Sequence, residues 1–171
     1  MAAVTDSFDL GRLRLTAGEG RRMELDVQID PLTFSDERYP VEPSQVPVVL
    51  DISRMNGAGW ALRLRFAASV AGPCMRCLEP AAPQFTVDAR EVEVPGEGEE
   101  LDSEYIEAEV LDLARWARDA LVLTLPQQVV CREDCAGLCA ECGENLNRFP
   151  DHAHERAPDP RWAALRELRL E

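Results

Sequence analysis

Eight side chains with metal-ligand chemistry are concentrated in two short segments of this chain. All six cysteines and both histidines lie within residues 74–77 or 131–154. Two cysteine pairs have C-x-x-C spacing, which lets two thiolates bind one tetrahedral zinc ion from a tight turn. The sequence therefore predicts zinc as the cofactor, bound by Cys74, Cys77, Cys131, Cys135, Cys139, Cys142, His152 and His154.

The spacing of these ligands leaves two groupings open. In the first, the second C-x-x-C pair forms a local site with the two histidines, and Cys74 and Cys77 share another ion with Cys131 and Cys135. In the second, the two C-x-x-C pairs share one ion as a ribbon, and Cys131, Cys135 and a histidine are left over. Disulfides are the less favoured use of these cysteines, because thiols stay reduced in the cytoplasm.

Composition and charge restrict the class of protein. The chain has 171 residues, of which 46% are hydrophobic, enough for one sizeable core with an appended module. The first fifteen residues lack the basic and apolar regions of a secretion signal, and no apolar run is long enough for a membrane helix. We therefore expect a cytoplasmic protein without a membrane partner.

The net charge is −14, and residues 91–112 contain ten acidic side chains and no basic one. Such a charge disfavours non-specific binding to nucleic acid.

Alternating hydrophobicity predicts an antiparallel sheet upstream of the cysteine-rich tail. Apolar residues alternate with polar ones over 23–29, 46–52 and 60–66, and the turn sequence at 55–59 makes the last two segments a hairpin. The third strand runs into the knuckle at 74–77, which should be the tip of the next hairpin. The returning strand over 85–94 changes phase, which predicts a β-bulge near Arg90.

Helix signals complete the predicted fold. An acidic loop over 95–104 precedes Asp112, a good N-cap for a helix from Leu113 to about Leu123 that Pro126 ends. We expect this helix to cover the open face of the sheet, and a second helix to span 160–168. The predicted fold class is α+β, with an antiparallel sheet domain and covering helix over 1–126 and a C-terminal Cys/His zinc-binding module over 127–171.

Recognisable catalytic machinery is missing from the sequence. There is no H-E-x-x-H motif and no nucleophile motif, so we predict a protein that is not an enzyme, has no catalytic residue and takes no small-molecule substrate. A metal-dependent nuclease would need carboxylate ligands for magnesium or manganese rather than thiolates. A zinc and thiol redox-sensing regulator, in which one C-x-x-C pair cycles with a disulfide, is the alternative function.

Four motifs in the right order give the chain a resemblance to a known family. They are C-x-R-C-L-E-P at 74–80, L-x-L-P at 123–126, C-x3-C-x-G-L-C-x-x-C-G-x-N-L-N at 131–147 and D-P-R-x-A-x-L at 159–165. Together they resemble the YceD family, which is named for large ribosomal RNA subunit accumulation. Many relatives carry C-x-C where this chain has His-Ala-His at 152–154, a replacement that preserves ligand type.

The resemblance implies a bacterial or plastid cytoplasmic factor for processing and accumulation of 23S rRNA and for assembly of the large ribosomal subunit. The implied partners are precursor 23S rRNA, a basic large-subunit ribosomal protein, or both. Arg76, Arg132 and Arg148 flank the cysteine clusters and are the candidate contacts to RNA or a partner. The acidic loop is the other candidate, for a basic protein. We favour the protein partner slightly, because the arginines act against the negative field of the whole chain.

Overall fold

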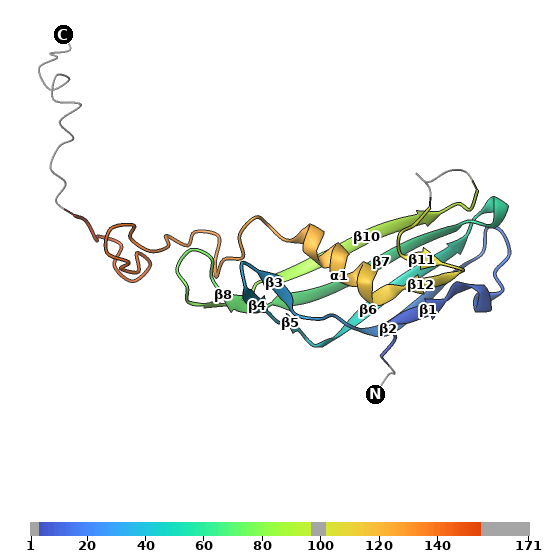
Figure 1. Ribbon diagram of the computed structural model, residues 1–171, viewed down its shortest axis with the longest axis horizontal. Coiled ribbons are helices and arrows are strands. Elements are labelled where there is room, and N and C mark those ends of the chain that lie inside the picture. Colours follow the sequence, from blue (N-terminus) through green and yellow to red (C-terminus); the bar gives the residue numbers. More distant parts are fainter. Residues whose placement is uncertain (1–3, 97–101, 155–171) are drawn as a thin grey trace, which may run out of the picture.

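The computed structural model describes residues 4–96 and 102–154 (Figure 1). The central part of the acidic loop and the helix expected over 160–168 therefore lie outside the described residues. The elements in chain order are β1 (Ser7–Asp9), η1 (Leu10–Leu13), β2 (Gly20–Gln28), β3 (Leu32–Phe34), β4 (Glu37–Tyr39), β5 (Val41–Glu42), β6 (Gln45–Arg54), η2 (Asn56–Ala58), β7 (Trp60–Val70), β8 (Gly72–Pro73), β9 (Pro80–Ala81), β10 (Gln84–Glu93), β11 (Ile106–Glu107), β12 (Val110–Asp112) and α1 (Leu113–Thr124).

A five-stranded antiparallel sheet forms the body of the molecule. Its main strand order is β10-β7-β6-β2, and β5 also pairs with β7. The β6–β7 hairpin has the register Leu50 opposite Leu64, and both of these leucines are fully buried. This hairpin confirms the prediction from the alternating pattern. A smaller sheet of order β1-β12-β11, which the sequence did not predict, pairs the start of the chain with the strand before α1.

The returning strand β10 corrects one prediction. Its register with β7 runs without interruption from Gln84 opposite Ser69 to Glu93 opposite Trp60, so the bulge predicted near Arg90 is wrong. Val92 instead points outward and is 42% exposed. Glu93 takes the inward phase because its carboxylate accepts a hydrogen bond from the amide of Ser103. The hydrogen bond from Ser103 thus lets Glu93 face inward, where the hydrophobic pattern predicted Val92.

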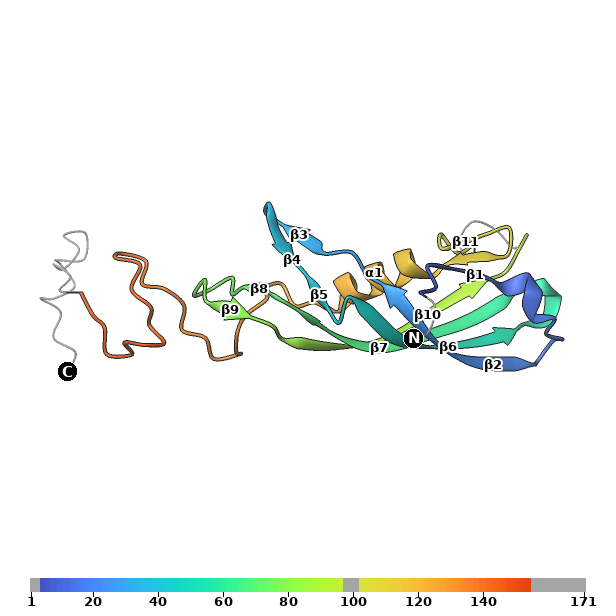
Figure 2. The same ribbon diagram turned by 90° about the horizontal axis from the view of Figure 1, so that it is seen from below.

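Helix α1 begins where its cap predicts. The Asp112 carboxylate accepts a hydrogen bond from the amide of Arg115 at 3.0 Å, and the helix ends just before Pro126. One stripe of α1 joins the same hydrophobic core as the sheet, and α1 contacts both β10 and β2 (Figures 1 and 2). Its buried residues are Leu113, Trp116, Ala117, Ala120 and Leu121. Within the two described ranges, no helix is long and apolar enough to cross a membrane.

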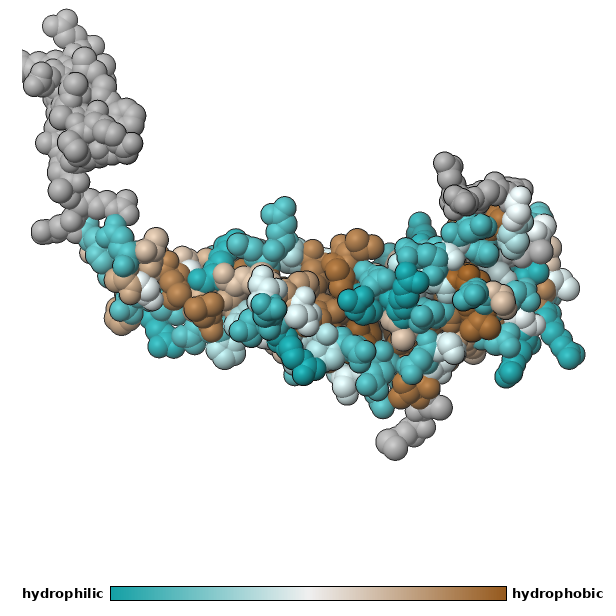
Figure 3. Space-filling view, viewed as in Figure 1, coloured by the Kyte–Doolittle hydropathy of each residue, from teal (hydrophilic) through white to brown (hydrophobic). Residues whose placement is uncertain are grey.

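The hairpin of β7 and β10 extends beyond the main sheet and carries the first knuckle. Short strands β8 and β9 pair with each other, and the loop between them contains residues 74–79. Tyr39 from β4 braces this extension, because its hydroxyl donates to the carbonyl of Pro73 at 3.1 Å. After α1 the chain passes the hairpin tip and then continues away from the sheet, which makes the molecule elongated (Figure 2). Figure 3 shows the hydrophobic residues of one face as separate patches among hydrophilic ones.

Candidate metal centres

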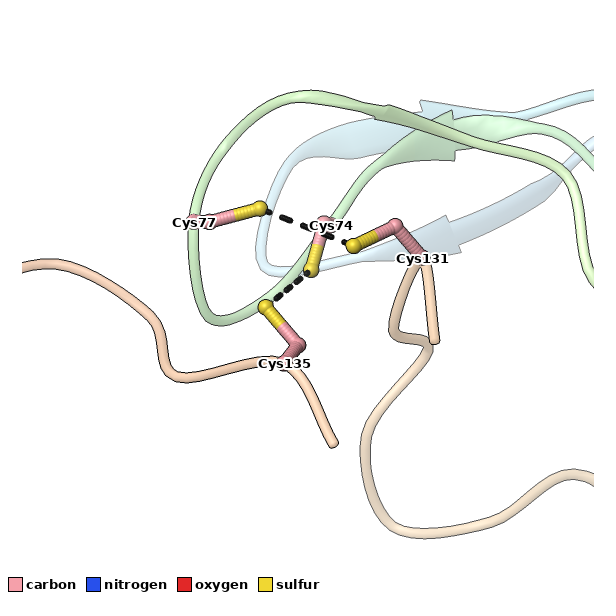
Figure 4. Close-up of side chains that lie close together, drawn as sticks. All are labelled: Cys74, Cys77, Cys131 and Cys135. Atoms are coloured by element: carbon pink, nitrogen blue, oxygen red, sulfur yellow. Dashed lines mark hydrogen bonds between the residues drawn. The ribbon is translucent and has the colours of Figure 1, made fainter. Parts of the chain in front are cut away.

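The first candidate centre joins the hairpin tip to the segment that follows α1. Cys74 and Cys77 come from the tip, Cys131 and Cys135 come from the later segment, and their four Sγ atoms lie within 4.8 Å of one another. The side chains point toward a common point (Figure 4). The Cys74–Cys135 and Cys77–Cys131 sulfur pairs are each 3.8 Å apart. Zinc–sulfur bonds of about 2.3 Å at tetrahedral angles place sulfurs about 3.8 Å apart, whereas a disulfide needs about 2 Å. The arrangement fits a tetrahedral zinc ion.

Hydrogen bonds lower the pKa of two of these thiols, Cys74 and Cys135. Burial raises the pKa of Cys74, but hydrogen bonds from the backbone at Cys77, Arg76 and Cys131 outweigh burial and lower it to about 6. A hydrogen bond from the Asn147 side chain is the largest cause that lowers the pKa of Cys135. Burial and then the neighbouring thiols raise the pKa of Cys131 to about 12. The pKa values of Cys74 and Cys135 are thus lowered without a cation, and a bound cation would favour the thiolate form of all four cysteines.

The second candidate centre is built from one continuous segment. Cys139, Cys142, His152 and His154 have their ligand atoms within 4.8 Å of one another. Each cysteine sulfur lies 3.2 Å from a histidine Nε2, and the two Nε2 atoms are 3.0 Å apart. Tetrahedral zinc with ordinary bond lengths gives about 3.5 and 3.3 Å, so the cluster is compact by about 0.3 Å. Its donor set and geometry also fit zinc.

The structure brings the eight predicted ligands together in the first of the two groupings that the sequence allowed. The two C-x-x-C pairs lie in different groups, so they do not share one site as a ribbon. The two groups differ in burial, since Cys74, Cys77 and Cys135 are buried whereas Cys142 is exposed. The identity of the metal and the ligand roles of these residues remain predictions.

Both knuckles have the same backbone hydrogen bonds. In the first, the amide of Leu78 donates to the carbonyl of Cys74 at 2.9 Å, and the amide of Cys74 donates to the carbonyl of Glu79 at 2.8 Å. The second repeats this pattern with Gly143 in place of Leu78, because the amide of Gly143 donates to the carbonyl of Cys139 at 2.8 Å. Both positions are left-handed, with φ of 61° at Leu78 and 76° at Gly143. That conformation strains a residue with a β-carbon by about 1–2 kcal/mol, whereas glycine adopts it freely.

The three arginines predicted to contact RNA or a partner all make bonds within the chain. The Arg76 guanidinium donates to the Gln128 side chain and to the carbonyls of Glu133 and Cys135, so it holds the tail against the hairpin tip. Arg148 pairs with Glu79 at 2.6 Å. Arg132 donates to Asn147 and pairs with Asp134. Arg132 and Arg148 are thus paired with carboxylates, whereas Arg76 bonds neutral oxygens.

Two asparagines have roles that the sequence analysis missed. The Asn147 side chain donates to Sγ of Cys135, and its amide donates to the side-chain oxygen of Asn145. Asn145 in turn donates to Glu79 on the hairpin tip. The signal was present in the N-x-N sequence that follows the second C-x-x-C pair, since asparagine both accepts and donates hydrogen bonds in tight turns.

Comparison with known proteins places these features in a family. A family model described as large ribosomal RNA subunit accumulation protein YceD matches residues 62–169, which is more than half of the chain. Uncharacterized proteins of Mycobacterium tuberculosis and Mycobacterium bovis are each 40% identical over 108 residues, which cover 60% of this chain and 52% of the relative. The chain thus spans about half the length of these curated relatives. An uncharacterized protein of Mycobacterium leprae is 47% identical over 58 residues, covering 34% of this chain and 26% of its own length. No solved structure matches the chain.

Proposed function

Because the chain belongs to the YceD family, we propose that it is a non-enzymatic bacterial factor for 23S rRNA processing and accumulation in large-subunit assembly. The match to the family model supports this proposal, because the family is named for accumulation of large-subunit ribosomal RNA. We place the protein in the cytoplasm, where reduced thiols remain available for metal.

The proposed role of zinc is structural. The first centre takes ligands from both sides of the proposed boundary between residues 1–126 and 127–171, so a bound ion would cross-link the Cys/His module to the sheet domain. In the sheet domain we propose that α1 serves as the cover of one face. Each group offers four protein donors, which fill a tetrahedral zinc ion and leave no open position for a substrate. This donor count supports a role without catalysis.

We favour an adaptor that binds a basic large-subunit ribosomal protein over direct contact with precursor 23S rRNA. RNA binding needs positive groups that are available to phosphate. The bonds of Arg76, Arg132 and Arg148 within the chain, together with the net charge of −14, support a protein partner instead. The acidic loop over 95–104 is the proposed complement to positive charge on that partner.

A zinc and thiol redox sensor is the second candidate function, and one observation favours it. Cys139 lies in the more exposed centre, and hydrogen bonds from the backbone at Glu141 and Cys142 lower its pKa to about 6. An accessible thiolate is the form that oxidants attack. Thiol titration with and without a chelator separates the candidates, because a sensor would lose metal and gain a disulfide under mild oxidant.

Depletion of the protein in its host tests the main proposal. We expect precursor 23S rRNA to rise and mature 23S rRNA to fall relative to 16S rRNA, with recovery when the wild-type chain is restored. Unchanged 23S rRNA would contradict the proposal.

Crosslinking in living cells, with identification of attached RNA and protein, then decides the mode of action. Crosslinks to a large-subunit ribosomal protein support the adaptor, whereas crosslinks concentrated on precursor 23S rRNA would show direct contact with RNA. Turnover of precursor RNA by the purified chain with magnesium would overturn the non-enzymatic role.

A further inference from the structure

Leu78 is a large apolar residue at a position whose backbone favours glycine. Its φ is 61°, and its equivalent in the second knuckle is Gly143. A glycine at position 78 would form the same turn without strain, as Gly143 does. The knuckle therefore does not explain why leucine is present.

Packing within the chain does not explain Leu78 either. Its side chain is 67% exposed, so it contributes little to the buried core. Exposed leucines are ordinary where the backbone is relaxed, as at Leu123, which is 84% exposed on the regular helix α1. Leu78 differs because exposure is combined with a strained conformation. Strain that the fold does not need is a reason to look for a function.

An open hollow adjoins Leu78 on the hairpin extension. Its volume is about 460 Å³, and its lining includes Leu78, Pro73, Pro80 and Ala82. The other apolar residues that line this hollow are Ala71, Gly72 and Ala81. Glu42 from β5 is the only charged side chain among the described residues that line it. The surface thus offers apolar contact with one carboxylate at its margin.

We propose that Leu78 and this hollow are a docking surface for a basic protein segment that carries an apolar side chain. Glu42, the one charged residue that lines the hollow within the described ranges, complements a positive charge on that segment. The Glu42 carboxylate would repel a phosphate backbone, and the apolar side chains of the hollow offer it no hydrogen-bond donor. Because Leu78 follows the candidate ligand Cys77, the first centre would hold it in a fixed position. The inference deepens the proposed function, since it rests on a basic large-subunit ribosomal protein as the partner.

Site-specific photocrosslinking tests the contact. A benzophenone amino acid is placed at position 78 in the zinc-loaded full chain, and at Leu123 in a matched chain. Each is mixed with proteins extracted from large ribosomal subunits of the host and freed of RNA, and separately with deproteinised 23S rRNA. We expect position 78 to crosslink to a basic segment of one ribosomal protein, and position 123 not to do so. Crosslinks from position 78 mainly to RNA, to a second copy of this chain or to its own residues 155–171 would overturn the proposal.

The ribosomal protein that crosslinking identifies is then purified, and its affinity for the full chain is measured with and without a change at Leu78. Leu78→Gly removes the apolar side chain and relieves the strain, so we expect binding about tenfold weaker or more, with unchanged zinc content and a thermal midpoint that does not fall. Leu123→Ala should change binding less than about twofold. If the wild type binds and Leu78→Gly binds equally well, the docking surface is wrong and the adaptor stands. If the wild type binds no ribosomal protein, the proposed adaptor fails together with its docking surface.

Discussion

The side-chain nitrogen of Asn147 donates a hydrogen bond to Sγ of Cys135 at 3.4 Å, while its oxygen accepts one from the amide of Ala136 at 2.9 Å. A residue that follows the second C-x-x-C pair thus orients a candidate ligand of the first centre. The two candidate centres are therefore linked by polar contacts as well as by the chain between them.

We predict that Asn147→Asp weakens zinc binding at the first centre by roughly 10–100-fold, the usual loss when a residue that orients a ligand is replaced. The carboxylate cannot donate to the Cys135 thiolate and repels it. Competition titration with a chromogenic chelator measures the affinity. Gln127→Glu makes the same amide-to-acid change on the segment before the centre and should leave the affinity unchanged. An equal loss in both variants would show that added charge, and not the hydrogen bond, is responsible.

The two centres should release metal at different rates. Three of the four candidate ligands of the first centre are buried, whereas Cys142 and His154 of the second are exposed. We therefore predict two phases of zinc release to excess chelator, the faster from the second centre. Stopped-flow absorbance of a zinc indicator records both phases. Cys142→Ser should abolish the fast phase alone, and loss of the slow phase instead would reverse the assignment.

Metal removal should loosen the hairpin tip and tail but leave the main sheet folded. The core of the sheet and α1 forms one hydrophobic cluster, and Cys74, Cys77, Ala81 and Cys135 form another. Hydrogen–deuterium exchange with and without chelator tests this. The amide of Met75, which donates to the carbonyl of Val129 at 2.9 Å, should exchange faster after chelation, while the amide of Leu64 in β7 stays protected. Loss of protection at Leu64 would mean that the ion is needed for the whole fold.

Sequence patterns predicted those helices and strands that depend on residues close together in the chain. Alternation over 46–66 gave the β6–β7 hairpin, and Asp112 gave the start of α1. The pattern failed at β10, because the Ser103 amide that bonds Glu93 lies in a later segment that spacing does not place. The pairing of β1 with β12 was missed for the same reason, since it joins segments about a hundred residues apart.

The same distinction holds for the candidate metal site. Spacing left two groupings of the eight candidate ligands open. The fold selects one of them, because α1 returns the chain to the hairpin tip and Cys74 then lies beside Cys135. Asn147 was missed because its role depends on where the tail turns back toward Cys135.

In cells, we predict that Cys74→Ser fails to restore 23S rRNA after depletion of the wild-type chain, because the tail is no longer held at the hairpin tip. The ratio of 23S to 16S rRNA should stay near its depleted value, while Leu123→Ala restores it. Immunoblotting must show equal amounts of both variants. Full recovery of this ratio by Cys74→Ser at equal abundance would show that the first centre is not needed for accumulation of 23S rRNA.

Native mass spectrometry of protein purified under reducing conditions counts the zinc ions bound to each chain, which we propose to be one at each candidate centre. We predict two zinc ions per wild-type chain, loss of one ion in Cys74→Ser, loss of one ion in Cys139→Ser, and loss of both in the double variant. A wild-type chain without zinc, or a single variant that empties both centres, would show that the chain does not hold two separate zinc ions.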